Sequence, residues 1–187
     1  MECGPFVNDE PWGPPVRLPP IVIDSDVTRP RMIQPQKVLE WAHTFVEEVR
    51  RDLEKASMEG SDLPPRLRLV NLRPGQMGPE TRTLAVPVPP GGEGSSPEIL
   101  SSLIARYVAD KPSSCLLLAL DVLAAGDGGE QQPLLIAEAR DRGGTRLFLM
   151  QPFRVEKERV LWDEPLGGGW QDPGREEMIL DAAFGKD

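Results

Sequence analysis

The stretch "CLLLALDVL" at residues 115–123 carries apolar side chains at both odd and even positions through its first six residues. The stretches "PLLIAEAR" (133–140) and "TRLFLMQPF" (145–153) follow it with the same pattern, and the loop "DRGG" between these two is typical of a hairpin. Because successive side chains of a strand point to opposite faces of its sheet, such strands are apolar on both faces and must be covered on both. These residues therefore predict three successive strands in the middle of a two-sided core.

The segments around these strands have patterns of their own. Residues 36–56 place apolar side chains on one helical stripe and charged side chains on the opposite face. Ser95 or Ser96 is expected to cap a second helix that starts at Pro97 and is closed by Pro112. The remaining predicted elements are strands over 66–72 and 83–88, a polar strand over 154–162 and a short closing helix over 175–184.

This order of elements predicts an α+β fold with a mainly antiparallel sheet packed against two longer helices, because helices do not alternate with every strand. Residues 1–35 hold eight prolines and are expected to form an extended arm. Residues 36–187 are expected to form a single α+β domain with a short C-terminal helix. The two longer helices can cover one face of the sheet, so the other face requires the arm, the closing helix or a second copy of the chain.

The composition disfavours several classes of partner. The chain has 187 residues and a net charge of −9, from 30 acidic and 21 basic residues. Nucleic acids and anionic membranes attract basic surfaces, so we expect neither as a partner, not even through Arg66, Arg68 and Arg73. We see no signal peptide and no apolar run long enough for a membrane span, so we expect a cytoplasmic protein with reduced cysteines. Abundant Arg, Pro, Gly and Ala point to a bacterial source.

A glycine-rich stretch, "WDEPLGGGWQDPGREEMIL" at residues 162–180, invites comparison with phosphate-binding loops. It lacks the Lys and hydroxyl residue of a P-loop, and Asp172 stands where the dinucleotide-binding pattern requires its third glycine. We interpret the glycines as a turn and Asp172 as the start of the closing helix. Trp162 and Trp170 flank this turn; core packing is the favoured interpretation for both, and a binding anchor is the alternative.

Four carboxylates are candidates for acid–base chemistry. Asp121 and Glu138 each interrupt an apolar strand, where a carboxylate either pairs with a cation, has its pKa raised or points to solvent. Asp163 and Glu164 form an adjacent pair. His43 is the only histidine, which excludes zinc sites built on paired histidines. No cofactor and no metal ion is predicted.

The chain resembles a group of small uncharacterised bacterial and phage proteins. The resemblance rests on "VLEWAHTFVEEVRRDLEKA", "LPPRLRLVNL", "LAVPVPP", "ILSSLIARYVA" and the run from "LLLALDVLAAG" to "PLLIAEARDRGGTRLFLMQPFRV", and covers roughly residues 36–155. It implies a leading helix, two strands, a second helix and a final meander. It implies no activity.

Two hypotheses about function follow. The first is a non-enzymatic protein-interaction module that acts as a homodimer or binds another protein, because the sheet is apolar on both faces and the helices are few. The alternative is a hydrolase-like enzyme for a small molecule, with a carboxylate site drawn from Asp121, Glu138, Asp163 and Glu164.

Overall fold

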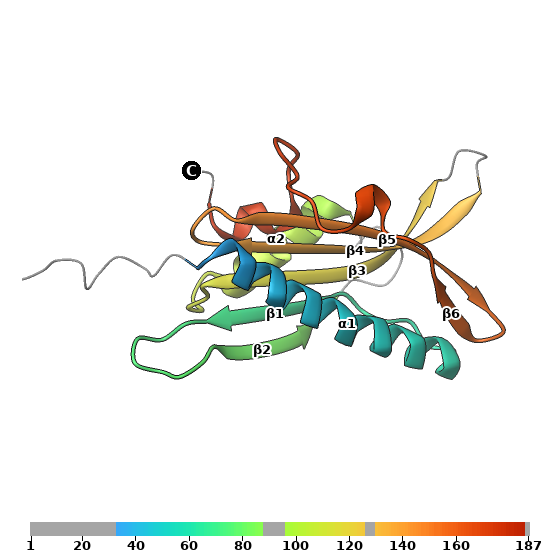
Figure 1. Ribbon diagram of the computed structural model, residues 1–187, viewed down its shortest axis with the longest axis horizontal. Coiled ribbons are helices and arrows are strands. Elements are labelled where there is room, and N and C mark those ends of the chain that lie inside the picture. The colour runs from blue at the N-terminus through green and yellow to red at the C-terminus, as the bar shows by residue number, and fades with distance from the viewer. Residues whose placement is uncertain (1–32, 88–95, 126–129, 186–187) are drawn as a thin grey trace, which may run out of the picture. The chain divides into compact units, whose positions relative to one another are not determined.

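The computed structural model describes residues 33–87, 96–125 and 130–185. The described part begins with a long helix, continues with a two-stranded hairpin and a second helix, and ends with four strands and two short 3-10 helices (Figure 1). The elements are α1 (Pro35–Glu59), β1 (Arg66–Asn71), β2 (Glu80–Ala85), α2 (Pro97–Val108), β3 (Cys115–Ala125), β4 (Gln131–Asp141), β5 (Arg146–Glu156), β6 (Arg159–Trp162), η3 (Leu166–Gly168) and η4 (Ile179–Ala183).

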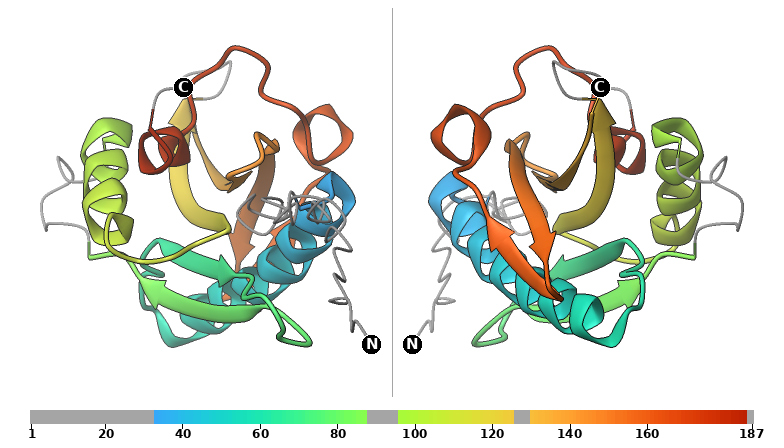
Figure 2. Two further views of the ribbon diagram at one scale, coloured as in Figure 1. Left: turned by 90° about the vertical axis from the view of Figure 1, so that its left-hand side faces the viewer. Right: turned by 90° about the vertical axis from the view of Figure 1, so that its right-hand side faces the viewer.

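All six strands belong to one antiparallel sheet with the order β2-β1-β3-β4-β5-β6. β3 to β6 form a meander, and the β1–β2 hairpin joins it because β1 pairs with β3. The sheet is curled as a half-barrel (Figure 2). The predicted α+β class with a mainly antiparallel sheet is confirmed, and so are the three central strands.

Helix α1 covers one face of the sheet. Pro35 stands in its first turn, and Gly60 ends it in the left-handed conformation with φ +64° that glycine adopts without strain. Its buried stripe packs against the odd-numbered residues of β3, which are Cys115, Leu117 and Ala119. This core also contains Leu135, Ala137 and Ala139 of β4, and Leu149 and Phe153 of β5.

Helix α2 and the 3-10 helix η4 cover the opposite face (Figure 2). Ser96 caps α2 by accepting the Ile99 backbone N–H at 3.3 Å, whereas Ser95 lies outside the described residues. The even-numbered residues of β3, which are Leu116, Leu118 and Leu120, pack here with Leu100, Ile104 and Leu180.

The two longer helices were expected on one face, and that expectation is wrong. Each face of β3 is apolar, so each attracts a helix of its own. The chain thus supplies the cover for which a second copy was invoked, and the oligomeric state stays a prediction. The Pro-rich arm over 1–35 lies almost wholly outside the described residues.

The closing helix predicted over 175–184 is also wrong, since only a 3-10 helix over Ile179–Ala183 forms. Asp172 does not start a helix; its Oδ1 accepts the Gly174 N–H at 2.8 Å in a tight turn. The N–H groups of Ile179 and Leu180 donate to the Glu138 side chain. These amides are therefore not available to carbonyls one turn earlier, as an α-helix over 175–184 requires.

None of the helices in the described ranges combines the length and the apolar character that a membrane crossing needs.

A matched set of substitutions in β3 tests the two-sided core. Leu117 and Leu118 point to opposite faces and are both 0% exposed, whereas Leu123 on the same strand is 64% exposed. We expect Leu117→Ala and Leu118→Ala each to lower the free energy of unfolding by about 2–5 kcal/mol, and Leu123→Ala to change it by about 0.5 kcal/mol or less. Urea unfolding measures all three. A Leu118→Ala effect as small as that of Leu123→Ala would contradict the cover by α2 and η4.

Candidate functional site

Glu138 lies in a cluster of charged side chains between β4, β5 and η4. It sits on β4, on the face covered by α2 and η4, directly across from Leu118 of β3. Only 3% of its surface is exposed. Oε1 accepts the Ile179 N–H at 3.0 Å and Oε2 accepts the Leu180 N–H at 2.9 Å. The carboxylate therefore binds the first turn of η4, a site where backbone donors lack partners within the helix.

Asp181 in η4 completes this cluster with two arginines. Its carboxylate accepts hydrogen bonds from Arg140 of β4, from Arg146 of β5 at 2.8 and 3.2 Å, and from the Met178 N–H at 2.8 Å. Arg146 also donates to the Gly174 carbonyl at 2.7 Å. Arginines from two strands, β4 and β5, thus bind the same aspartate of η4.

The pKa values of the two acids in this cluster are shifted in opposite directions. Burial raises the pKa of Glu138, and the two backbone N–H groups and Arg146 offset this only in part. For Asp181 burial also acts to raise the pKa, but the Met178 N–H, Arg146 and Arg140 outweigh it, and the pKa is lowered. Each carboxylate has structural partners that account for its position.

Asp121 lies apart from this cluster. It belongs to the odd-numbered residues of β3 and thus points to the α1 face, whereas Glu138 points to the other. Its side chain is exposed, yet desolvation by the surrounding protein and repulsion from Asp62 raise its pKa. Because the side chain is exposed, solvent screens its charge and the energetic effect is small.

Asp163 and Glu164 follow β6 and do not form a paired site. Asp163 continues the chain beside β5, where its N–H donates to the Pro152 carbonyl at 3.0 Å and its carboxylate accepts from Arg154 at 3.2 Å. Glu164 is exposed. The four predicted acids therefore do not form one site: Asp121 and Glu138 lie on opposite faces of the sheet, and Asp163 and Glu164 follow β6 at its edge.

Both candidate tryptophans contact helix α1. Trp162 donates its Nε1–H to Glu54 at 2.9 Å, and the Arg50 guanidinium lies 4.6 Å from its ring centroid. The Trp170 ring meets His43 edge-on at 6.2 Å. Both indoles are partly buried against the α1 core. They fasten the segment after β5 to the helix, as the core interpretation expects.

The three glycines between these tryptophans form a turn. Gly167, Gly168 and Gly169 have φ angles of +67°, +84° and +131°, conformations that a side chain strains. The Gln171 side chain occupies the space beside Gly167 and donates to the Leu166 carbonyl at 2.9 Å.

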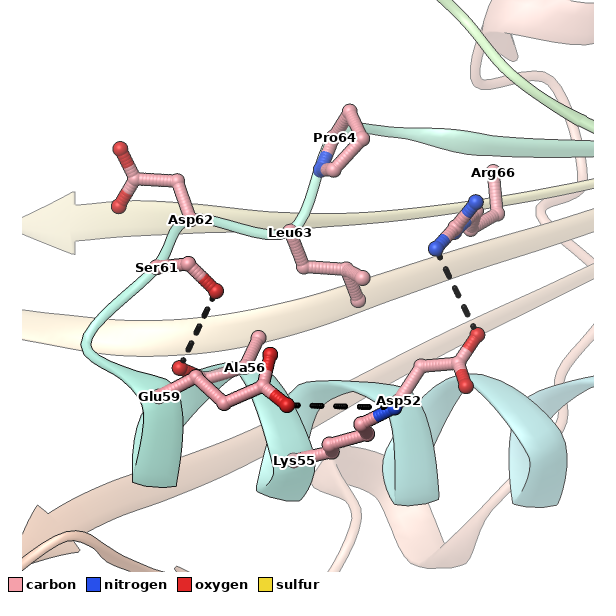
Figure 3. Close-up of a pocket in the computed structure, with 9 residues that line it drawn as sticks. All are labelled: Asp52, Lys55, Ala56, Glu59, Ser61, Asp62, Leu63, Pro64 and Arg66. Carbon is pink, nitrogen blue, oxygen red and sulfur yellow. Dashed lines mark hydrogen bonds and ion pairs between the residues drawn. The ribbon is translucent and has the colours of Figure 1, made fainter.

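An open pocket of about 210 Å³ lies at the C-terminal end of α1 (Figure 3). Four of its five charged side chains pair with one another, and Asp62 is the fifth. Arg66 approaches Asp52 at 3.6 Å, and Lys55 approaches Glu59 at 3.9 Å. Asp121, Glu138, Asp163 and Glu164 are not among its lining residues.

The described ranges contain neither a cluster that could bind a metal ion nor a reactive thiol. Among residues 33–87, 96–125 and 130–185, no three histidine, cysteine, aspartate or glutamate side chains come together in a way that could hold a metal ion. Cys115 is a buried free thiol. Burial and the neighbouring Asp141 raise its pKa, so it stays protonated and unreactive.

Sequence reasoning identified Glu138 but missed its partners. Arg140 lies two residues further along β4, and that spacing places both side chains on one face. This was the available signal for a charged patch within the sheet. Asp181 gave no signal, because it follows Glu138 by more than forty residues in an acidic tail.

A comparison with known proteins finds no matching family model and no significant similarity to a curated protein or a solved structure.

Glu138→Gln tests the role of the buried carboxylate. An amide has one oxygen, so one of the two η4 N–H groups loses its acceptor and faces an NH₂ donor instead. We expect the free energy of unfolding to fall by about 1–3 kcal/mol in urea unfolding at pH 7. The exposed Glu164→Gln is the control and should change it by about 0.5 kcal/mol or less. Equal effects of the two variants would refute a structural role for Glu138.

Asp121→Asn tests the raised pKa on the α1 face. A carboxyl whose pKa is higher in the folded than in the unfolded protein destabilises the fold as the pH rises above the ordinary aspartate pKa. The neutral variant should therefore unfold at slightly higher urea than the parent at pH 7. At about pH 3 both side chains are largely neutral, and the difference should shrink. A variant that is less stable at pH 7 would contradict the direction of this shift.

Proposed function

We propose that this protein is a non-enzymatic protein-interaction module whose partner is a second copy of the chain, bound through the outer edge of β2. The proposal rests on the outer edge of β2, whose backbone groups are unpaired among the described strands. β2 is the last strand of the sheet, and no described strand pairs with its outer side. Five of its six residues are exposed. A free strand edge is a template for another strand.

The direction of the β2 backbone groups follows from its pairing with β1. Val86 donates its N–H to the Pro65 carbonyl at 2.7 Å, in register with the pairs from Arg66↔Ala85 to Asn71↔Glu80. In an antiparallel ladder alternate residues direct both backbone groups to the same neighbour. Residues in phase with Val86 thus bond to β1, whereas Thr81 and Thr83 direct their N–H and carbonyl groups outward.

The side chains of β2 favour pairing with an identical strand. If two copies meet antiparallel about Thr81, Glu80 of each copy lies opposite Arg82 of the other. Both residues are exposed, and both lie on the α2 face of the sheet. By symmetry, this register brings two pairs of oppositely charged side chains together, each between Glu80 of one copy and Arg82 of the other. The contact is isologous and closes after two copies.

This surface differs from the one first inferred for a dimer. The apolar faces of the sheet are covered by α1, α2 and η4, so they do not require a second chain. The edge is polar, and strand pairing through it buries little apolar area. We therefore expect a reversible dimer that depends on concentration rather than a permanent one.

The enzyme alternative has less support. It required Asp121, Glu138, Asp163 and Glu164 to act together, but Asp121 and Glu138 lie on opposite faces of the sheet, and Asp163 and Glu164 follow its edge strand β6. Glu138 also binds the η4 backbone with both of its oxygens. A cytoplasmic location remains part of the proposal and is supported by the free thiol of Cys115.

Thr81→Pro tests the edge. Proline removes the outward N–H and leaves the bonds to β1 in place, so the monomer should keep its fold. Thr81→Val is the matched control because it keeps the donor and a β-branched side chain. Light scattering after gel filtration should give about twice the 20.6 kDa chain mass for the parent and the control, and the chain mass for Thr81→Pro.

A charge exchange tests the register. Glu80→Arg and Arg82→Glu each place like charges opposite one another and should weaken the dimer, whereas the double variant restores opposite charges and should recover it. Sedimentation over a concentration series compares the four proteins. A parent that is monomeric throughout would overturn the proposed function. If none of the substitutions at residues 80, 81 and 82 weakens the dimer, the dimer contact lies elsewhere than at the β2 edge.

A further inference from the structure

The last described segment, residues 173–185, contains η4 and is named here the C-terminal strap. η4 lies between α2 and the sheet (Figure 2). Before it, Gln171 is bonded to Phe148 of β5 through both of its backbone groups, each at 2.9 Å. Gly174, with φ +63°, then redirects the chain. The strap therefore follows a fixed point at Gln171, and a glycine lies close to that point.

Polar and apolar contacts both attach the strap. Glu138 accepts the N–H groups of Ile179 and Leu180, Arg146 donates to the carbonyls of Gly174 and Glu176, and Ser101 of α2 donates to the Ile179 carbonyl at 2.9 Å. Met178 and Leu180 are buried, and Ile179, Ala183 and Phe184 are partly buried against the α2 core. The strap thus buries fewer apolar side chains than β3 does, and such a segment opens at a lower free energy than core strands do.

Asp181 is the point on which this attachment depends. It is the strap's own charged group in the cluster and it forms ion pairs with both Arg140 and Arg146. Arg140 is 9% exposed, and its Nε is buried without a hydrogen-bond partner among the described residues. Removing one partner from a buried pair leaves an uncompensated charge, which costs far more than an exposed pair contributes. Here two arginines would lose their partner and face each other.

We infer that the strap is a conformational latch: it detaches from the sheet as a unit while α1, α2 and the six strands stay folded, and Asp181 locks it. Detachment withdraws Leu180 from the core that it shares with Leu116 and Leu118, and so uncovers apolar surface between α2 and β4. The elements that remain have buried contacts of their own, including Leu100 and Ile104 of α2. This device is independent of strand pairing at β2.

Hydrogen exchange of the full chain, followed by mass spectrometry, tests the latch. Asp181→Asn keeps the shape of the side chain and removes its charge. We expect exchange at the Ile179 and Leu180 amides to rise at least about tenfold, with no change in peptides from β3. Asp163→Asn is the matched control, since it breaks a more exposed pair with Arg154 and should change neither region.

Two results would overturn the latch. Exchange that rises equally in the strap and in β3 would show that the strap unfolds only with the whole domain. A strap that exchanges no faster in Asp181→Asn would show that Asp181 is not its lock. If Asp181→Asn does not fold, Ser101→Ala decides between these outcomes, because it removes one uncharged bond to the strap and should raise exchange there alone.

Discussion

The structure depends on one constraint, which is that β3 is apolar on both faces and must be shielded from water on both. Leu116, Leu117 and Leu118 are each 0% exposed although successive residues point in opposite directions. A sheet with one wet face could not contain this strand. The placement of α1 on one side and of α2 with η4 on the other follows from it. So does the central position of β3, with β1 and β4 as neighbours.

The same constraint explains why a charged cluster lies within the sheet. On the α2 face, β4 is apolar at Leu134 and Ile136 but charged at Glu138 and Arg140. An apolar helix cannot cover such a boundary, because buried charges require partners. A 3-10 helix fits, since it offers free backbone N–H groups to Glu138 and an aspartate to Arg140. The charged residues of β4 thus explain why a 3-10 helix covers this part of the strand.

Local patterns were sufficient to predict most of the elements but not their arrangement. The central strands follow from their continuous apolar runs, helix α1 follows from its helical periodicity, and the start of α2 follows from Ser96 and Pro97. The face that each helix covers depends on contacts between distant segments, which periodicity does not encode. The closing helix failed for a related reason. Its amides bond to Glu138, a residue about forty positions earlier, and this tertiary bond overrides local helix propensity.

The covered faces restrict where this protein can bind a macromolecule without unfolding. A partner cannot reach the apolar rows of β3, because helices occupy both sides. Within the described residues, the sheet offers instead a polar strand edge at β2. Pairing at this edge orients a partner through backbone bonds and buries little apolar area. The proposed detachment of the strap would add an apolar surface beneath η4, at the cost of breaking the bonds of Asp181. Strand pairing is therefore the mode available to the fold as described, whereas apolar docking would require that detachment.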